Sequence, residues 1–199
     1  MVQFMAGLGK QAKILTDSQF RALEKHIAES RYATRNKVIL LLSYKSGLRA
    51  KEIASLTWAM VSDSEGQIQK EIHLTNKASK GKSGRVIPMH DKLFEALTAY
   101  AKETGIKPDA TIIRTQKAKA TSAQFISNLF KQWYTELGFD GCSSHSGRRT
   151  FITAAAKKIS SVGGSIRDVQ ALAGHSNLQT TQKYIDQNSE SQKAVIKLI

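Results

Sequence analysis

The apolar run from Val38 to Leu42 constrains the fold of this chain more than any other feature of its sequence. It lies inside a helical pattern from about Thr34 to Ser46, and Gly47 supplies a natural stop. Because consecutive apolar residues cover every side of a helix, other elements must surround this one. The sequence therefore predicts a central helix in the core of one compact domain, for which 199 residues are sufficient.

Amphipathic and capping patterns predict further helices around the central one. Between Trp58 and Met89, short alternating runs separated by turn-rich pieces predict a small antiparallel sheet at one edge. The expected fold class is therefore mainly α with a small antiparallel β-sheet (α+β). The other expected helices are one opened by Thr16-x-x-Gln19, residues 50–56, a segment with Leu93, Leu97 and Tyr100, a segment with Phe125, Leu129 and Trp133 opened by Thr121-x-x-Gln124, about Ser146 to Ser160, one opened by Ser165-x-x-Asp168 and ending near Ala173, and a short helix ending in Tyr184.

The charge of the chain indicates a polyanionic partner. Lys and Arg number 30 against 16 Asp and Glu, which gives a formal net charge of +14. The windows 72–90, 110–135 and 141–167 contain no acidic residue, so the excess is concentrated as a nucleic-acid surface requires. The alternative is a basic protein whose charged faces are only solvated.

Several other classes of protein are excluded by the sequence. Cys142 is the only cysteine, so no internal disulfide forms and no zinc-type Cys/His spacing exists. The N-terminus lacks an apolar run long enough for export, and no stretch is long and apolar enough for a membrane span. We expect a reducing, cytoplasmic environment, no membrane association and no metal.

Polar residues suited to phosphodiester chemistry occur in four separate short motifs. Taken alone, each has an ordinary explanation: a surface arginine, lysines that solvate a turn, a histidine at a helix start and a tyrosine in a core. The motifs are SGLRAKEI with Arg49, ASKGKSGR with Lys80 and Lys82, SSHSGRRT with His145 and Arg148, and AGHSNLQTTQKYI with His175 followed nine positions later by Tyr184.

In this order the motifs resemble the tyrosine recombinase or phage integrase family, and the resemblance covers about Thr16 to Asp186. It implies that Glu52 is an acid that braces the site from behind the catalytic residues. The alternative is that Glu52 is an ordinary exposed acid on a helix. It also implies Lys80 rather than Lys82 as the catalytic lysine. The implied catalytic residues are Arg49, Lys80, His145, Arg148, His175 and the nucleophile Tyr184.

The resemblance implies an enzyme: a site-specific DNA recombinase that cleaves and rejoins strands through a 3′-phosphotyrosyl intermediate, with no cofactor. Rigid guanidiniums at Arg49 and Arg148 suit the charge that develops on the phosphate oxygens. Two alternatives remain open, a type IB topoisomerase and a non-catalytic DNA-binding regulator that keeps the fold. Residues expected to contact DNA outside the catalytic set are Lys77, Lys82, Arg85, Lys117, Lys119 and Arg149.

The expected organisation is a flexible basic lead-in (1–13), a catalytic domain (14–188) and a C-terminal tail (189–199) that can be exchanged between subunits. The resemblance implies double-stranded DNA as partner, a homotetramer on paired sites, an accessory DNA-bending or clamping protein, and association with the nucleoid. Relatives usually carry a DNA-clamping domain before the catalytic domain. Two interpretations of this chain therefore remain, a catalytic fragment and a minimal recombinase. The family also usually has a large apolar residue at the position of Gly147. The helix that begins near Ser146 is therefore expected either to be anchored more weakly or to be anchored by Phe151.

Overall fold

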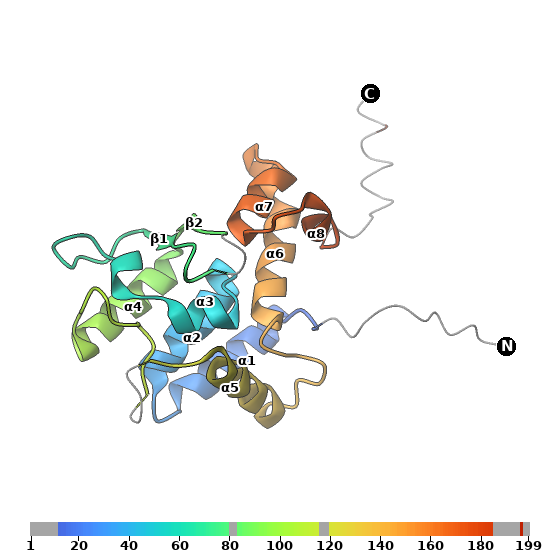
Figure 1. Ribbon diagram of the computed structural model, residues 1–199. Coiled ribbons are helices and arrows are strands. Elements are labelled where there is room, and N and C mark those ends of the chain that lie inside the picture. Colours follow the sequence, from blue (N-terminus) through green and yellow to red (C-terminus); the bar gives the residue numbers. More distant parts are fainter. Residues whose placement is uncertain (1–11, 80–82, 116–119, 185–195, 197–199) are drawn as a thin grey trace.

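The computed structural model describes residues 12–79, 83–115, 120–184 and 196, and it confirms a mainly helical fold with a small antiparallel sheet (Figure 1). No helix within these ranges combines the length and apolar character that crossing a bilayer requires. In chain order the elements are α1 (Asp17–Ala28), α2 (Ala33–Ser46), α3 (Ala50–Ser55), a 3-10 turn (Trp58–Met60), β1 (Glu71–Leu74), β2 (Arg85–Pro88), α4 (Asp91–Thr104), α5 (Ala123–Glu136), α6 (Ser146–Lys158), a second 3-10 turn (Ile159–Val162), α7 (Ile166–Ala173) and α8 (Leu178–Gln182).

Helix α2 is the centre of the core, as the sequence predicts. Every side chain from Val38 to Leu42 is fully buried, and α2 packs against α1, α3, α4 and α6. The helix ends at Gly47, which adopts a left-handed conformation with φ of 63°. A left-handed residue is favourable for glycine, so the chain turns sharply here toward Arg49 and α3.

The remaining local predictions are confirmed in part. Strands β1 and β2 form an antiparallel pair with Leu74 opposite Arg85. Capping boxes open α1 at Thr16 and α7 at Ser165. The predicted cap of α5 is wrong by one residue, because the side chain that accepts a hydrogen bond from the Phe125 N–H belongs to Ser122, not Thr121.

A second, smaller core lies at one end of α6, where Figure 1 shows α7 and α8. Its buried members are Ile152, Val169 and Ala173, and Tyr184 packs against them. The prediction of a helix ending in Tyr184 is wrong, because α8 ends at Gln182 and Tyr184 follows it. The tyrosine is therefore held by packing against this small core and by the hydrogen bond from its backbone N–H to the Thr181 carbonyl at 3.0 Å.

Gly147 allows α6 to lie unusually close to α2. A Cβ at this position would overlap the Ser43 hydroxyl on α2. One helical turn later, the Phe151 ring lies against Gly47. Of the two expectations for this departure from the family pattern, anchoring through Phe151 is the one that the packing supports.

Replacing Leu41 by Ala tests the central position of α2. We expect a loss of about 2–5 kcal/mol in the free energy of unfolding, because the residue is fully buried and a cavity would remain. Urea denaturation measures this change. Lys37→Ala on the same helix is exposed and should stay within about 0.5 kcal/mol of the parent; equal effects of the two substitutions would contradict the assignment.

Candidate active site

A pocket of about 380 Å³ opens where the starts of α3 and α6 meet the segment around α8. We call it the arginine pocket. Five of the six predicted catalytic residues line it, and the sixth, Lys80, lies outside the described residues. The lining residues are Ala12, Arg49, His145, Arg148, Arg149, His175, Thr180, Lys183 and Tyr184.

Arg148 is held by main-chain carbonyls rather than by an acid. Its Nη1 donates to the Gly47 carbonyl and its Nη2 to the Ala173 carbonyl, each at 2.6 Å. The side chain is almost fully buried. Burial, together with the nearby charge of Arg49, lowers the pKa of Arg148 to about 9. The guanidinium stays cationic at neutral pH and is fixed between the ends of α2 and α7.

His175 is fixed by a threonine on the short helix that precedes the tyrosine. Its Nδ1 lies 2.9 Å from the hydroxyl of Thr181, which has no exposed surface. Partial burial, followed by the charges of Arg148 and Arg49, lowers the pKa of His175 to about 4. The ring is therefore neutral at physiological pH. It stacks on Tyr184 with ring centroids 5.9 Å apart, which places the histidine and the tyrosine in one unit.

Glu52 is fully buried and joins two arginines. Its Oε1 accepts from Arg49 Nη1 at 2.9 Å and from Arg85 Nη1 at 3.1 Å, and its Oε2 accepts from the Arg49 backbone N–H at 2.8 Å. Burial by itself raises the pKa of Glu52, but the hydrogen bonds and charges of the two arginines outweigh it and hold that pKa below 4.5. The alternative of an exposed helix acid is excluded, and the geometry fits a brace for Arg49.

Arg85 does not occupy the exposed position expected of a DNA-contacting residue. Its side chain is 7% exposed, and its Nε donates to the Leu172 carbonyl of α7 at 2.8 Å. Gly174 leaves room for it, since a Cβ there would lie 2.7 Å from Nη1. The guanidinium is committed to Glu52 and α7, so it ties β2 to both, and contact of Arg85 with DNA stays a prediction.

The sequence matches the Phage integrase family over residues 13–191. The chain belongs to this family. Tyrosine recombinase XerC of Rhizobium meliloti (strain 1021) is 31% identical over 179 residues, which cover 86% of this chain and 53% of that protein. Tyrosine recombinase XerA of Thermococcus kodakarensis is 29% identical over 174 residues, which cover 86% and 57%. This integrase-family chain thus spans about half the length of these curated relatives.

Solved structures share the fold. A Tn1549 transposon integrase in complex with a circular intermediate DNA has a TM-score of 0.76 at 20% identity, covering 98% of this chain and 68% of that chain. The crystal structure of XerA recombinase has a TM-score of 0.68 at 22% identity, covering 93% and 64%. At these identities the likeness concerns the fold, which is that of tyrosine recombinases.

The other basic residues predicted to contact DNA are dispersed. Lys77 is exposed just after β1, and Arg149 lines the arginine pocket, where its Nη1 donates to the Ala12 carbonyl at 2.8 Å. Lys82, Lys117 and Lys119 lie outside the described residues. Of the described members of this set, Arg149 is therefore the one that lies in the same pocket as the family's catalytic motifs.

Sequence reasoning missed two positioning residues of this integrase-family site. Thr181 orients His175, and no periodic pattern in the short helix marks it. Arg85 holds Glu52, and here a signal existed: residues two apart in a strand share a face, and Ile87 is an inward-facing core residue. The alternation in RVIP therefore placed Arg85 on the buried side.

Removing Arg85 tests the buried ion pair. Arg85→Met should cost about 3–5 kcal/mol of unfolding free energy, because the Glu52 carboxylate would lose a buried partner. Urea denaturation at neutral pH gives the value, with exposed Lys77→Met as the matched control. The folded pKa of Glu52 is depressed, so its contribution is present above pH 4.5 and is lost as pH falls below it. A Glu52→Gln variant should lack this part of the acid dependence; an unchanged acid profile would contradict the assignment.

The electrostatics of His175 can be measured directly. Its imidazole should titrate with a pKa of about 4 in the DNA-free protein, and Arg148→Gln should raise that pKa because a neighbouring cation is removed. Proton NMR of the ring C–H signals, assigned with a His175→Asn variant, follows the titration. A midpoint near 6.5 in the parent protein would show that the ring is neither desolvated nor close to the arginines.

Proposed function

We propose that this chain is the catalytic domain, residues 14–188, of a site-specific DNA recombinase that cleaves and rejoins strands through a 3′-phosphotyrosyl intermediate. The observation that carries the proposal is the arginine pocket, in which Tyr184 lies beside Arg49, Arg148, His145 and His175. The curated relatives are named tyrosine recombinases, which supports the same chemistry.

The proposed first step is attack of the Tyr184 oxygen on a DNA phosphorus. A bond forms between that oxygen and phosphorus, and the bond from phosphorus to the 5′ oxygen breaks. A tyrosine hydroxyl titrates near pH ~10 in water, so attack at neutral pH needs cationic surroundings or a base. In this proposal His145, an exposed residue that lines the pocket, accepts the tyrosine proton, and Lys80 donates a proton to the departing 5′ oxygen.

The guanidiniums of Arg49 and Arg148 stabilise the charge on the non-bridging oxygens. Both are positioned in advance, one by Glu52 and the other by two carbonyls. His175 is neutral, so when Thr181 donates to Nδ1 the ring proton is on Nε2 and can be donated to a phosphate oxygen. Because one ester replaces another, the reverse attack by a 5′-hydroxyl reseals the strand and restores Tyr184.

The proposed substrate is double-stranded DNA. The net charge of +14 supports this, and the integrase of Tn1549 was solved in complex with a circular intermediate DNA. Strand exchange needs paired sites, so we further propose a homotetramer in which the tail 189–199 is exchanged between subunits, assisted by a DNA-bending or clamping protein. A chromosomal substrate would place the protein with the nucleoid in the cytoplasm.

Trapping on a nicked substrate tests the proposal. The substrate is a randomised pool of nicked duplexes, each of which releases a short strand when it is cleaved. Because the reverse attack needs the 5′-hydroxyl of that strand, the covalent adduct persists as an SDS-resistant band. Tyr184→Phe should abolish that band because the nucleophilic oxygen is absent, whereas Tyr32→Phe, at the far end of α2, should retain it.

Two further measurements separate the rival functions. DNA binding without any adduct from the parent protein would favour the regulator. Relaxation of supercoiled plasmid by the parent protein, without strand exchange between two copies of the captured sequence, would favour the type IB topoisomerase.

A further inference from the structure

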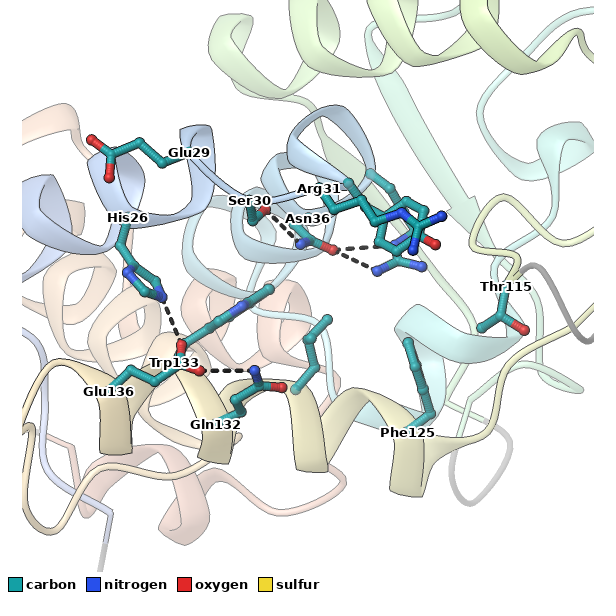
Figure 2. A pocket seen from close by; sticks show the side chains of 13 residues that line it. His26, Glu29, Ser30, Arg31, Asn36, Thr115, Phe125, Gln132, Trp133 and Glu136 are labelled. Atoms are coloured by element: carbon teal, nitrogen blue, oxygen red, sulfur yellow. Dashed lines mark hydrogen bonds and ion pairs between the residues drawn. The ribbon is translucent and has the colours of Figure 1, made fainter.

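A second and larger hollow, of about 840 Å³, lies between α5 and the turn that joins α1 to α2 (Figure 2). We call it the α5 groove. It shares no lining residue with the arginine pocket. The two lie toward opposite ends of α2, whose 14 residues span ~21 Å. The groove is therefore a separate feature of the molecule, and the proposed DNA chemistry makes no use of it.

The α5 groove contains an arginine that is buried without an acidic partner. Arg35 is 8% exposed, and its Nε and Nη2 both donate to the neutral Oδ1 of Asn36, at 3.1 and 2.9 Å. In the described part of the chain no carboxylate forms an ion pair with it. A buried cation is unfavourable when no anion compensates it.

Aromatic rings surround this arginine and extend the site. The Arg35 guanidinium carbon lies 4.4 Å from the Tyr32 ring centroid and 5.5 Å from that of Phe125. Arg31, which is exposed, lies over the same Tyr32 ring at 5.3 Å. Two guanidiniums thus lie over one tyrosine ring at the same end of the groove, and one of them also lies over Phe125.

The rest of the groove is apolar or already hydrogen-bonded, apart from the exposed carboxylate of Glu29, which Figure 2 shows near His26 at the end away from the arginines. Leu129 continues the apolar wall of α5 from Phe125, whereas Trp133, which also lines the groove, is only 2% exposed and belongs to the core. At the far end, Figure 2 shows Glu136 between His26 and Gln132, which contact its carboxylate oxygens at 2.7 and 2.8 Å. The uncompensated positive charge is therefore confined to the arginine end, and the body of the groove offers flat apolar surface.

We infer that the α5 groove binds a small organic anion, with a phosphate or carboxylate head group on Arg35 and Arg31 and a planar body against the partly exposed side chains of Phe125 and Leu129. A guanidinium fork matches both head groups. The volume is in the range of small-molecule sites, and aromatic side chains suit a planar body. The head group supplies the counter-charge that Arg35 lacks.

Calorimetric titration of the full chain without DNA tests this site and does not depend on recombinase activity. Adenosine 5′-monophosphate and indole-3-acetate probe the two head groups, and adenosine probes the body alone. We expect saturable binding of at least one anion and much weaker binding of adenosine. Binding of the nucleotide alone assigns a phosphate ligand, binding of the indole acid alone assigns a carboxylate, and binding of both shows that either head group fits.

Charge-matched variants locate the binding. Arg35→Gln should weaken it about tenfold or more, since a charge-assisted hydrogen-bond pair is lost. Arg31 is exposed, so we expect Arg31→Gln to fold normally and also to weaken binding. This variant decides the test if Arg35→Gln does not fold. Arg21→Gln removes the same charge from an exposed site on α1 and should bind normally.

Three results would overturn the proposal. One is the absence of saturable binding of either anion below about 1 mM. Another is equal weakening by Arg21→Gln, which would indicate attraction to the overall positive charge. The third is loss of binding in Arg49→Gln but not in the groove variants, which would place the anion in the arginine pocket.

Discussion

The buried carboxylate of Glu52 is the constraint on which the geometry of the site depends. A fully desolvated carboxylate is unfavourable unless cations and hydrogen bonds compensate it, and here Arg49 and Arg85 do so together. Their approach fixes the start of α3 against β2. The cost of leaving Glu52 unpaired thus keeps Arg49 in one position, and a precisely held guanidinium is what phosphoryl chemistry requires.

The end of α7 contributes a second kind of support. The last carbonyls of a helix have no partner within the helix and carry partial negative charge. In this protein Leu172 and Ala173 offer these carbonyls to Arg85 and Arg148. The residue that follows, Gly174, begins the turn that carries His175. The arginines and the segment bearing Tyr184 therefore support each other, so neither half of the site is expected to keep its geometry without the other.

The sequence predicted what depends on local pattern. The all-round apolar run required a central α2, and the pairs at Thr16 and Ser165 marked helix starts correctly. It did not predict contacts between distant segments. The Glu52 to Arg85 pair spans 33 positions, so the alternation in RVIP indicates an inward-facing arginine but not the acid that it binds. The cap at Ser122 was missed because Thr121 and Ser122 are both competent caps, and tertiary contacts decide which one is used.

The balance of charge explains why such a site suits an anionic substrate. Around Glu52, three guanidiniums gather near a single carboxylate, and the charges of Arg49 and Arg85 add to burial in lowering the pKa of Arg148 and of His175. These cations repel one another in the free protein, while Glu52 and the carbonyls hold them together. In the proposed reaction, a phosphate that enters the pocket supplies the missing negative charge, and more of it as charge accumulates on the oxygens during attack. The repulsion is relieved most at that point, so the folded scaffold favours the transition state over the empty site.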